Sequence, residues 1–228
     1  MTGRAHQYEP LEQALGYTFK RIELLDQALT HRSYAAASGG LHNERLEFLG
    51  DAVLQLVVSA HLYAKFPDLP EGQLAKIRAL LVSQPTLAKL GRRLKLDVFL
   101  KVGKGEELTG VRQRDSVLCD TVEAVYGAVF LDGGFSAAQP VILAQLPEWD
   151  KDQLPIVDAK TTLQEHFQQR TQKTPTYTLA GEQGPAHNKQ FTVEVWFEDE
   201  LLGRGHGRSK KEAAQAAARA ALANLDLI

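Results

Sequence analysis

The segment HNERLEFLGDAVL, residues 42–54, places three carboxylates on a helix that is otherwise almost entirely apolar. Glu44, Glu47 and Asp51 follow at i, i+3 and i+7, which gathers them within an arc of about 60°. Apolar residues, Phe48 among them, flank this arc, and a helix that is apolar nearly all round is normally buried. Three like charges on a buried helix need bound protons, basic partners or a cation, so we expect one of these beside it.

A second segment, CDTVEAVYGAVFLDGG at residues 119–134, repeats this pattern. Asp120 and Glu123 are i, i+3 neighbours on a helix made mainly of Val, Ala, Tyr and Phe. Ala124 and Gly127 flank the two acids, and small residues there allow a neighbouring helix to approach closely. We expect that neighbour to be the first acidic helix. The carboxylates that this packing would bring together are Glu47, Asp51, Asp120 and Glu123.

The ligand types indicate which cation such a cluster would hold. Oxygen ligands, without regularly spaced His or Cys, favour Mg²⁺ or Mn²⁺ over zinc. Mg²⁺ keeps several waters and binds substrate phosphates, so the cluster suits hydrolysis of a phosphodiester by metal-activated water. An i, i+3 acidic pair is more often a solvated helix face. Glu44 and Glu71 also have a structural explanation, because acids near a helix start favour the helix dipole.

Length and composition are those of a globular protein, with 228 residues, 44% apolar and 24% charged. Cys119 is the single cysteine, which excludes an intramolecular disulfide, and we interpret it as a core residue rather than a nucleophile. No segment approaches the roughly 18 apolar residues of a membrane span, so we expect a soluble, cytoplasmic chain with no membrane partner. The net charge of -2 gives no indication of nucleic acid.

The pattern of the chain changes near its middle. Up to about residue 148 the apolar periodicity is helical almost throughout, which predicts an all-α first domain over residues 1–148. Residues 149–159 are polar, contain Pro155 and form the predicted linker. Residues 160–228 read as a small α-β-β-β-α domain, with strands in TYTLA, KQFTVEVWF and LLGRGHG. Ser209 and Glu212 form a capping-box signature at its last helix.

At this point the motifs themselves resemble a known family. HNERLEFLGDAVL closely resembles the signature of the ribonuclease III family, and LGYTFKRIELLDQALTHRSY, EGQLAKIRALLVS and DSVLCDTVEAVYGAVFLDGG resemble further helices of its endonuclease domain. Residues 160–226 resemble a double-stranded RNA binding domain. The resemblance implies an all-α ribonuclease III endonuclease domain followed by a small α+β binding domain, in the order of the bacterial enzymes.

The resemblance also implies an activity. It is Mg²⁺-dependent cleavage of double-stranded RNA by a homodimer, leaving 5′-phosphate and 3′-hydroxyl ends with short 3′ overhangs, in the processing of rRNA precursors and other structured transcripts. No organic cofactor is implied. Asp51 and Glu123 would be catalytic, and Glu44 and Glu71 would support the subunit interface and substrate channel. The implied metal ligands are Glu47, Asp120 and Glu123.

The second domain offers two kinds of RNA contact. A-form RNA exposes 2′-hydroxyls in its shallow minor groove, and polar side chains along one side of the domain's first helix can bind them. The residues concerned are Thr161, Gln164, Glu165 and Gln168. By resemblance, His187 in the GPAH segment would make a second minor-groove contact. A simple turn is the alternative there.

A basic cluster predicts the phosphate contacts. Lys210 and Lys211 lie in the first turn of the last helix, where a cation opposes the helix dipole unless an anion binds. Arg204 and Arg208 precede them with no acid in between, so we expect a phosphate clamp. Arg114 and a neighbouring arginine, Arg112, could add phosphate contacts from a Gly-rich loop, or that loop could be an ordinary one.

Two other functions are compatible with parts of this pattern. A chain with the same fold could bind structured RNA without cleaving it, although the intact acidic quartet argues against this. A carboxylate-bridged di-iron helical protein would need Glu-x-x-His pairs on facing helices, and the chain has Glu-x-x-Glu and Asp-x-x-Glu instead.

Overall fold

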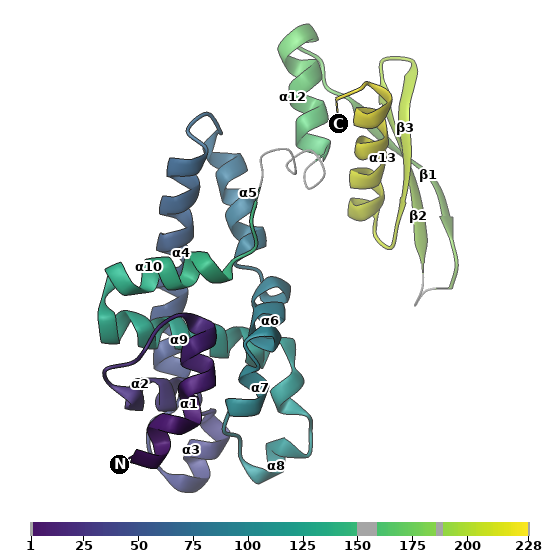
Figure 1. The fold of residues 1–228 in the computed structure, drawn as a ribbon. Helices are drawn as coiled ribbons and strands as arrows, with labels where there is room; N and C mark the ends of the chain where they lie inside the picture. Colours follow the sequence, from purple (N-terminus) through teal and green to yellow (C-terminus); the bar gives the residue numbers. More distant parts are fainter. Residues whose placement is uncertain (1, 150–158, 186–188, 228) are drawn as a thin grey trace. The chain divides into compact units, whose positions relative to one another are not determined.

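The computed structural model describes residues 2–149, 159–185 and 189–227 and divides into two compact units, Met1–Glu148 and Trp149–Ile228 (Figure 1). His187 and most of the predicted linker, residues 150–158, lie outside the described residues.

The first unit is helical throughout its described part, which confirms the predicted all-α class. Its α-helices are α1 Thr2–Leu15, α2 Ile22–Ala28, α3 Arg32–Ser38, α4 Glu44–Lys65, α5 Glu71–Leu81, α6 Gln84–Arg93, α7 Leu96–Phe99, α8 Lys104–Glu107, α9 Asp115–Gly133 and α10 Phe135–Gln145. A 3-10 turn, Val111–Gln113, leads into α9.

Helices α4 and α9 form the centre of this unit, and two glycines set how closely they approach. A Cβ on Gly50 would lie 1.7 Å from the carbonyl oxygen of Glu123, and a Cβ on Gly127 would lie 2.2 Å from that of Leu46. The helices therefore meet backbone to backbone, and a larger residue at either glycine would force them apart. The close approach expected at Gly127 is confirmed, whereas its counterpart Gly50 was not anticipated.

The expectation that α4 is buried nearly all round is wrong for this single chain. Phe48 is 82% exposed, Leu56 57% and Tyr63 77%. One face of α4 packs against α9, and these three side chains lie outside that contact. By length and composition α4 alone among the described helices could cross a membrane, which is weak evidence because a core helix passes the same test.

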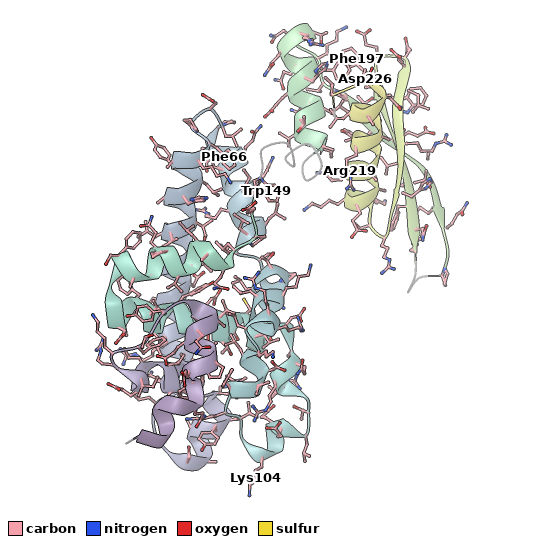
Figure 2. The ribbon with its side chains drawn as sticks, viewed as in Figure 1. Phe66, Lys104, Trp149, Phe197, Arg219 and Asp226 are labelled. Atoms are coloured by element: carbon pink, nitrogen blue, oxygen red, sulfur yellow. The ribbon has the colours of Figure 1, made fainter. Side chains whose placement is uncertain are left out.

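The second unit has the predicted α-β-β-β-α order. Its elements are α12 Ala159–Thr171, β1 Thr176–Gln183, β2 Gln190–Phe197, β3 Glu200–Gly207 and α13 Lys210–Asn224. The strands form an antiparallel sheet in the order β1-β2-β3. Phe197 at the end of β2, labelled in Figure 2, packs against the core of this unit. It stacks on Phe167 of α12 with ring centroids 4.0 Å apart, which ties this helix to the sheet.

Helix α13 covers one face of the sheet at very short range. Cβ atoms on Gly203 and Gly205 of β3 would lie 2.6 and 2.1 Å from backbone atoms of Ala217. The start of α13 is capped, because Ser209 Oγ accepts a hydrogen bond from Glu212 N at 3.1 Å. The Glu212 carboxylate accepts from the N–H of Arg208 at 2.9 Å, so the capping signature is present with its return bond shifted by one residue.

Candidate functional site

Four carboxylates meet where α4 crosses α9. Glu47 and Asp51 come from α4, and Asp120 and Glu123 come from α9. Burial raises the pKa of Glu123 to about 7, with further upward contributions from Asp51, Asp120 and Glu47. Burial also raises the pKa of Glu47, again with Asp120 and Asp51 adding to it. The structure therefore brings the four carboxylates into one electrostatically coupled cluster.

The four acids differ in exposure. Asp120 and Glu123 are partly buried, and burial raises the pKa of Asp120 as well. Asp51 is exposed at the edge of the cluster, where its Oδ1 accepts a hydrogen bond from Gln55 Nε2 at 3.3 Å. Asp51 is thus the most exposed of the four acids, while the other three are partly buried.

Cys119 adjoins the acidic cluster. It is 8% exposed, and its Sγ lies 3.8 Å from Glu123 Oε1, to which the thiol donates. Burial, followed by the neighbouring carboxylates, raises the pKa of the thiol to about 12. Potential ligand atoms of Cys119, Asp120 and Glu123 lie within 4.8 Å of one another, close enough to share one ion. A thiol with this pKa stays protonated at neutral pH, which agrees with a packing role rather than that of a nucleophile.

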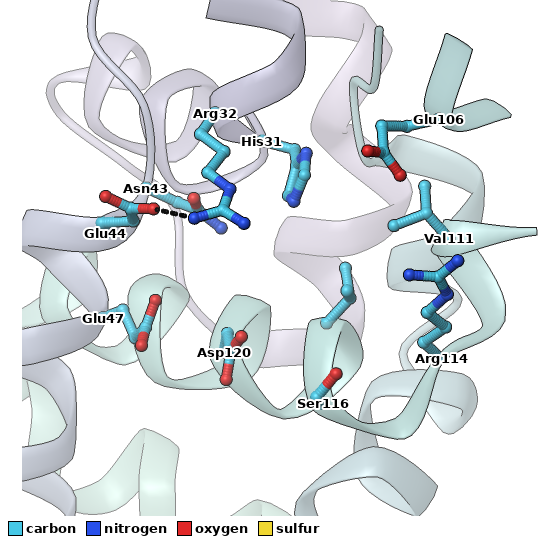
Figure 3. A pocket seen from close by; sticks show the side chains of 11 residues that line it. His31, Arg32, Asn43, Glu44, Glu47, Glu106, Val111, Arg114, Ser116 and Asp120 are labelled. Atoms are coloured by element: carbon cyan, nitrogen blue, oxygen red, sulfur yellow. Dashed lines mark ion pairs between the residues drawn. The ribbon is translucent and has the colours of Figure 1, made fainter. Parts of the chain in front are cut away.

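Two of the four acids, Glu47 and Asp120, line a hollow of about 490 Å³ (Figure 3), whereas Asp51 and Glu123 are not among its lining residues. Its lining combines carboxylates with cationic and polar groups from the segments around α3, α4 and the start of α9. The lining residues are His31, Arg32, Asn43, Glu44, Glu47, Glu106, Val111, Arg114, Ser116, Val117 and Asp120. An anionic ligand entering this hollow would meet the acids on one wall and arginines on its rim.

The two rim arginines are held differently. Arg32 Nη1 lies 3.5 Å from Glu44 Oε1, so Glu44 keeps this guanidinium beside the hollow (Figure 3). Arg114 donates from Nη2 to Thr109 Oγ1 at 3.1 Å, and it forms no ion pair within the described ranges. Arg32 was missed by sequence reasoning, because only the fold brings it next to the acids.

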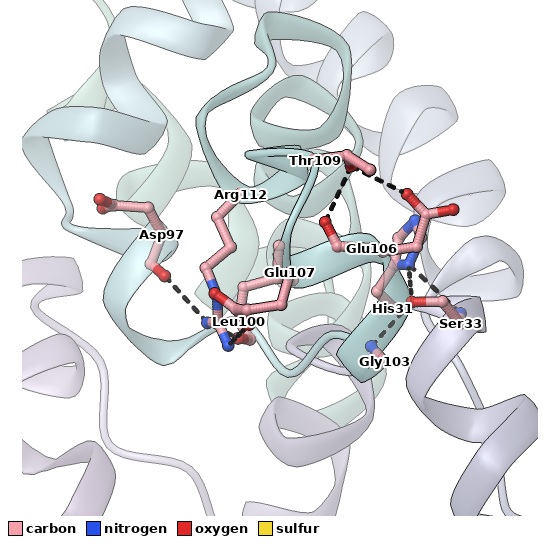
Figure 4. A network of polar contacts seen from close by, with 9 residues as sticks. All are labelled: His31, Ser33, Asp97, Leu100, Gly103, Glu106, Glu107, Thr109 and Arg112. Carbon is pink, nitrogen blue, oxygen red and sulfur yellow. Dashed lines mark hydrogen bonds and ion pairs between the residues drawn. The ribbon is translucent and has the colours of Figure 1, made fainter.

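His31 belongs to the polar network behind this rim (Figure 4). Its Nδ1 accepts a hydrogen bond from the N–H of Ser33 at 3.2 Å and so caps α3. Ser33 Oγ in turn accepts from the N–H of Gly103 at 2.9 Å. Burial and the neighbouring Arg32 lower the pKa of His31, which keeps the ring neutral at pH 7. His31 is therefore a structural capping residue.

Arg112 is tied into the fold rather than offered to a ligand. Its guanidinium donates to the Glu107 carboxylate at 2.7 and 2.8 Å and to the carbonyl oxygen of Asp97 at 3.1 Å (Figure 4). Of the two loop arginines expected to contact phosphate, only Arg114 lines the hollow.

Glu71 lies apart from the acidic hollow. It begins α5 and lines a separate hollow of about 160 Å³ between α4 and α5, together with Tyr63 and Arg78. Arg78 Nη1 donates to Ser59 Oγ at 2.8 Å in this place. Glu44 and Glu71, which were predicted to have similar supporting roles, thus lie in two different hollows.

In the second unit, the predicted minor-groove residues share one helix, α12. Gln164 and Gln168 are exposed, and their amides hydrogen-bond at 3.4 Å. Thr161 and Glu165 are partly buried beside them. The spacing of these four residues makes a polar strip along α12.

The predicted basic cluster is divided by the fold. Gly203 and Gly205 face α13, so Arg204 between them projects from the opposite face of the sheet. There its Nε lies 3.0 Å from Glu194 Oε1. Lys210 Nζ lies 3.7 Å from Glu182 Oε1. The sequence has no acid between these cations, but in the fold the neighbouring strands supply carboxylates to Arg204 and Lys210.

Comparisons with known proteins agree with both units. The pattern described as Ribonuclease-III-like matches residues 21–148, and the double-stranded RNA binding motif matches residues 159–225. Ribonuclease 3 of Symbiobacterium thermophilum is 51% identical over 214 residues, covering 92% of this chain and 91% of that protein. Ribonuclease 3 of Oleidesulfovibrio alaskensis is 48% identical over 224 residues, covering 96% and 98%.

A solved structure resembles the first unit. The nuclease domain of ribonuclease III from Campylobacter jejuni is 44% identical, with a TM-score of 0.58, and the match covers 60% of this chain and 94% of that one. The fold and site thus define a helical nuclease domain joined to a double-stranded RNA binding domain. The chain belongs to the ribonuclease III family.

Proposed function

We propose that this chain is a divalent-cation-dependent endoribonuclease that hydrolyses phosphodiester bonds in double-stranded RNA. The observation that carries the proposal is the convergence of four coupled carboxylates, two of which line an open hollow, in a chain that also has a double-stranded RNA binding motif. Products with 5′-phosphate and 3′-hydroxyl ends and short 3′ overhangs, action on rRNA precursors and other structured transcripts, and a cytoplasmic location belong to the same proposal.

The residues present fit a hard divalent cation. Burial and mutual repulsion raise the pKa of Glu47, Asp120 and Glu123, which is the condition of carboxylates that lack a counter-charge. Carboxylate oxygens are preferred ligands of Mg²⁺ and Mn²⁺, so these three residues would hold the ion. Such an ion supplies an activated water and stabilises negative charge on the reacting phosphate.

The chain's own side chains would position the RNA around that ion. Asp51, exposed at the edge of the cluster, orients the attacking water by accepting its hydrogen bond. Arg32 and Arg114 on the rim bind backbone phosphates next to the one being cleaved. Glu44 supports catalysis indirectly, because its ion pair holds Arg32 at the rim. A cation held by Glu47, Asp120 and Glu123 would offset the repulsion between these acids and RNA phosphates.

A homodimer explains the exposed face of α4. Phe48 lies at a hollow of about 660 Å³ whose lining includes Leu41, Leu49 and Leu131. Phe48 and Leu41 are largely exposed in the single chain, and such a patch is the usual mark of a protein interface. The Campylobacter jejuni nuclease domain is described as structurally flexible in a region involved in dimer formation. We infer that this chain also forms a dimer, through the exposed face of α4, with Glu71 supporting the neighbouring channel.

The second unit would hold the duplex by shape rather than by sequence. Gln164 and Gln168 offer amide groups to 2′-hydroxyls of the minor groove. Lys210 and Lys211, at the start of α13, bind phosphates that also satisfy the positive end of the helix dipole.

One matched pair of variants tests the proposal. Glu123→Gln should abolish cleavage of a long, perfectly paired RNA in Mg²⁺ while leaving binding in Ca²⁺ nearly unchanged. Glu23→Gln changes the net charge equally at an exposed position on α2 and should cleave normally. Cleavage by the Glu123→Gln variant would refute the metal site. Binding without cleavage by the unmodified chain would instead favour an RNA-binding scaffold.

A further inference from the structure

Glu182, near the end of β1, lies between two lysines that are far apart in the sequence. Its Oε2 pairs with Lys189 Nζ, and its Oε1 lies 3.7 Å from Lys210 Nζ. The hydrogen bond from Lys189 and the charges of both lysines lower the pKa of Glu182. A single carboxylate therefore bridges a cation beside β2 and a cation in the first turn of α13.

The same two lysines converge on one aromatic ring. Lys189 Nζ lies 5.6 Å and Lys210 Nζ 5.9 Å from the centroid of Phe191. Both cations are thereby held near one another over a fixed part of the sheet. Two ammonium groups placed in this way form a binding site, here called the seat, for an anion with several acceptor oxygens. In the chain without RNA, the Glu182 carboxylate occupies this seat.

We propose that Glu182 is an internal competitor of RNA phosphate. Lys189 and Lys210 together form a seat for one backbone phosphate, and the duplex has to displace the Glu182 carboxylate to use it. This inference rests on the proposed binding of double-stranded RNA, and it adds Lys189 as a phosphate contact and Glu182 as a determinant of affinity. Because a carboxylate and a phosphate compete for the same charges, Glu182 lowers affinity for every duplex, whatever its sequence.

The matched control is a different acid–base pair on this sheet. Glu194 pairs with Arg204 on the face opposite α13, away from the proposed seat. Glu194→Gln changes the net charge by the same amount as Glu182→Gln. A general electrostatic effect would therefore raise the RNA affinity of both variants. Freeing Lys189 and Lys210 from the Glu182 carboxylate would raise the affinity of Glu182→Gln alone.

The test is the affinity of the full chain for a labelled, perfectly paired RNA of about 20 base pairs, enough for one binding domain, in EDTA so that no cleavage occurs. At low salt, Glu182→Gln should bind about three- to ten-fold more tightly than the unmodified chain, and Glu194→Gln should stay within about two-fold. The difference should shrink as salt rises, because salt already screens the internal pair.

A double-mutant comparison identifies Lys189. Lys189→Ala should weaken binding only slightly in the unmodified chain, where Glu182 already occupies this lysine, and more strongly in the Glu182→Gln background. Equal affinities of Glu182→Gln and Glu194→Gln, or no coupling with Lys189, would overturn the inference. If the unmodified chain itself bound no duplex, the proposed function would fail first, so the two failures are distinguishable.

Discussion

Replacing Glu123 by Gln should stabilise the metal-free protein above neutral pH. Burial, with three neighbouring carboxylates, raises the pKa of Glu123 from 4.5 to about 7. A raised pKa means that the folded state favours the protonated form, so its stabilising contribution is complete below pH 4.5 and is lost as pH rises through 7. At pH 8 the Glu123 carboxylate is charged in the folded chain. The neutral amide of Gln avoids this charge, so the variant should be the more stable protein.

The magnitude follows from the same shift. A pKa shift from 4.5 to about 7 corresponds to at most about 3–4 kcal/mol, at about 1.36 kcal/mol per pKa unit. Solvent reaches part of this carboxylate and screens it, so we expect roughly 1–2 kcal/mol. For a domain of this size that stabilisation raises Tm by roughly 2–8 °C.

Thermal unfolding in EDTA at pH 5 and pH 8 measures the effect. Glu123→Gln should match the unmodified chain at pH 5 and exceed it at pH 8, and Glu23→Gln should show no such pH dependence. Adding Mg²⁺ at pH 8 should stabilise the unmodified chain more than the variant, because the ion neutralises the carboxylate. Equal stabilities at pH 8 without metal would refute the reasoning that this cluster is electrostatically strained.

Three other perturbations probe the packing and the interfaces. Gly50→Ala should lower stability by about 3 kcal/mol or more, because its Cβ would lie 1.7 Å from a carbonyl oxygen of α9; thermal unfolding measures this. Phe48→Glu should convert a dimer into monomers, as sedimentation would show, since it charges the exposed apolar face. Lys210→Ala combined with Lys211→Ala should reduce the slope of log affinity against log salt by up to about 2.

Gly50→Ala has a matched control, and each of the three predictions has a result that would contradict it. Gly72→Ala adds the same methyl group where nothing lies within 4 Å, and it should leave Tm nearly unchanged. A Gly50→Ala variant as stable as Gly72→Ala would mean that α4 and α9 do not meet as described. If the Phe48→Glu variant still formed a dimer, the interface would have to lie on another surface. If the slope of log affinity against log salt did not change in the double lysine variant, the phosphate contacts would have to lie outside α13.

The acidic cluster could be predicted from the sequence because the spacing of its carboxylates is a local pattern. Carboxylates at i, i+3 on apolar helices fix which face each acid occupies, and Gly127 indicates a close helix neighbour. The exposed Phe48 was not predictable in this way. An amphipathic pattern shows that a side chain avoids water, and it does not distinguish burial within one chain from burial against a second copy.

The RNA-binding surface was less predictable because its charges meet through the sheet. Lys210 and Glu182 are distant in sequence, and antiparallel pairing and helix packing bring them together. Arg204 was grouped with Lys210 because they are close in sequence. Gly203 and Gly205 face α13, so the alternation of side chains along β3 places Arg204 on the opposite face of the sheet. Arg32 was missed for the same reason, since it reaches the acidic hollow only in the folded chain.

Cleavage of a long, perfectly paired RNA by the purified chain, with Mg²⁺, with Ca²⁺ or with EDTA, tests the central claim most directly. Denaturing gels and end analysis should show short products with 5′-phosphates in Mg²⁺ alone, because the carboxylates on α4 and α9 need a cation that activates water. Intact RNA in Mg²⁺, together with a shift on a native gel, would contradict the claim and leave the chain as an RNA-binding protein with an unexplained acidic cluster.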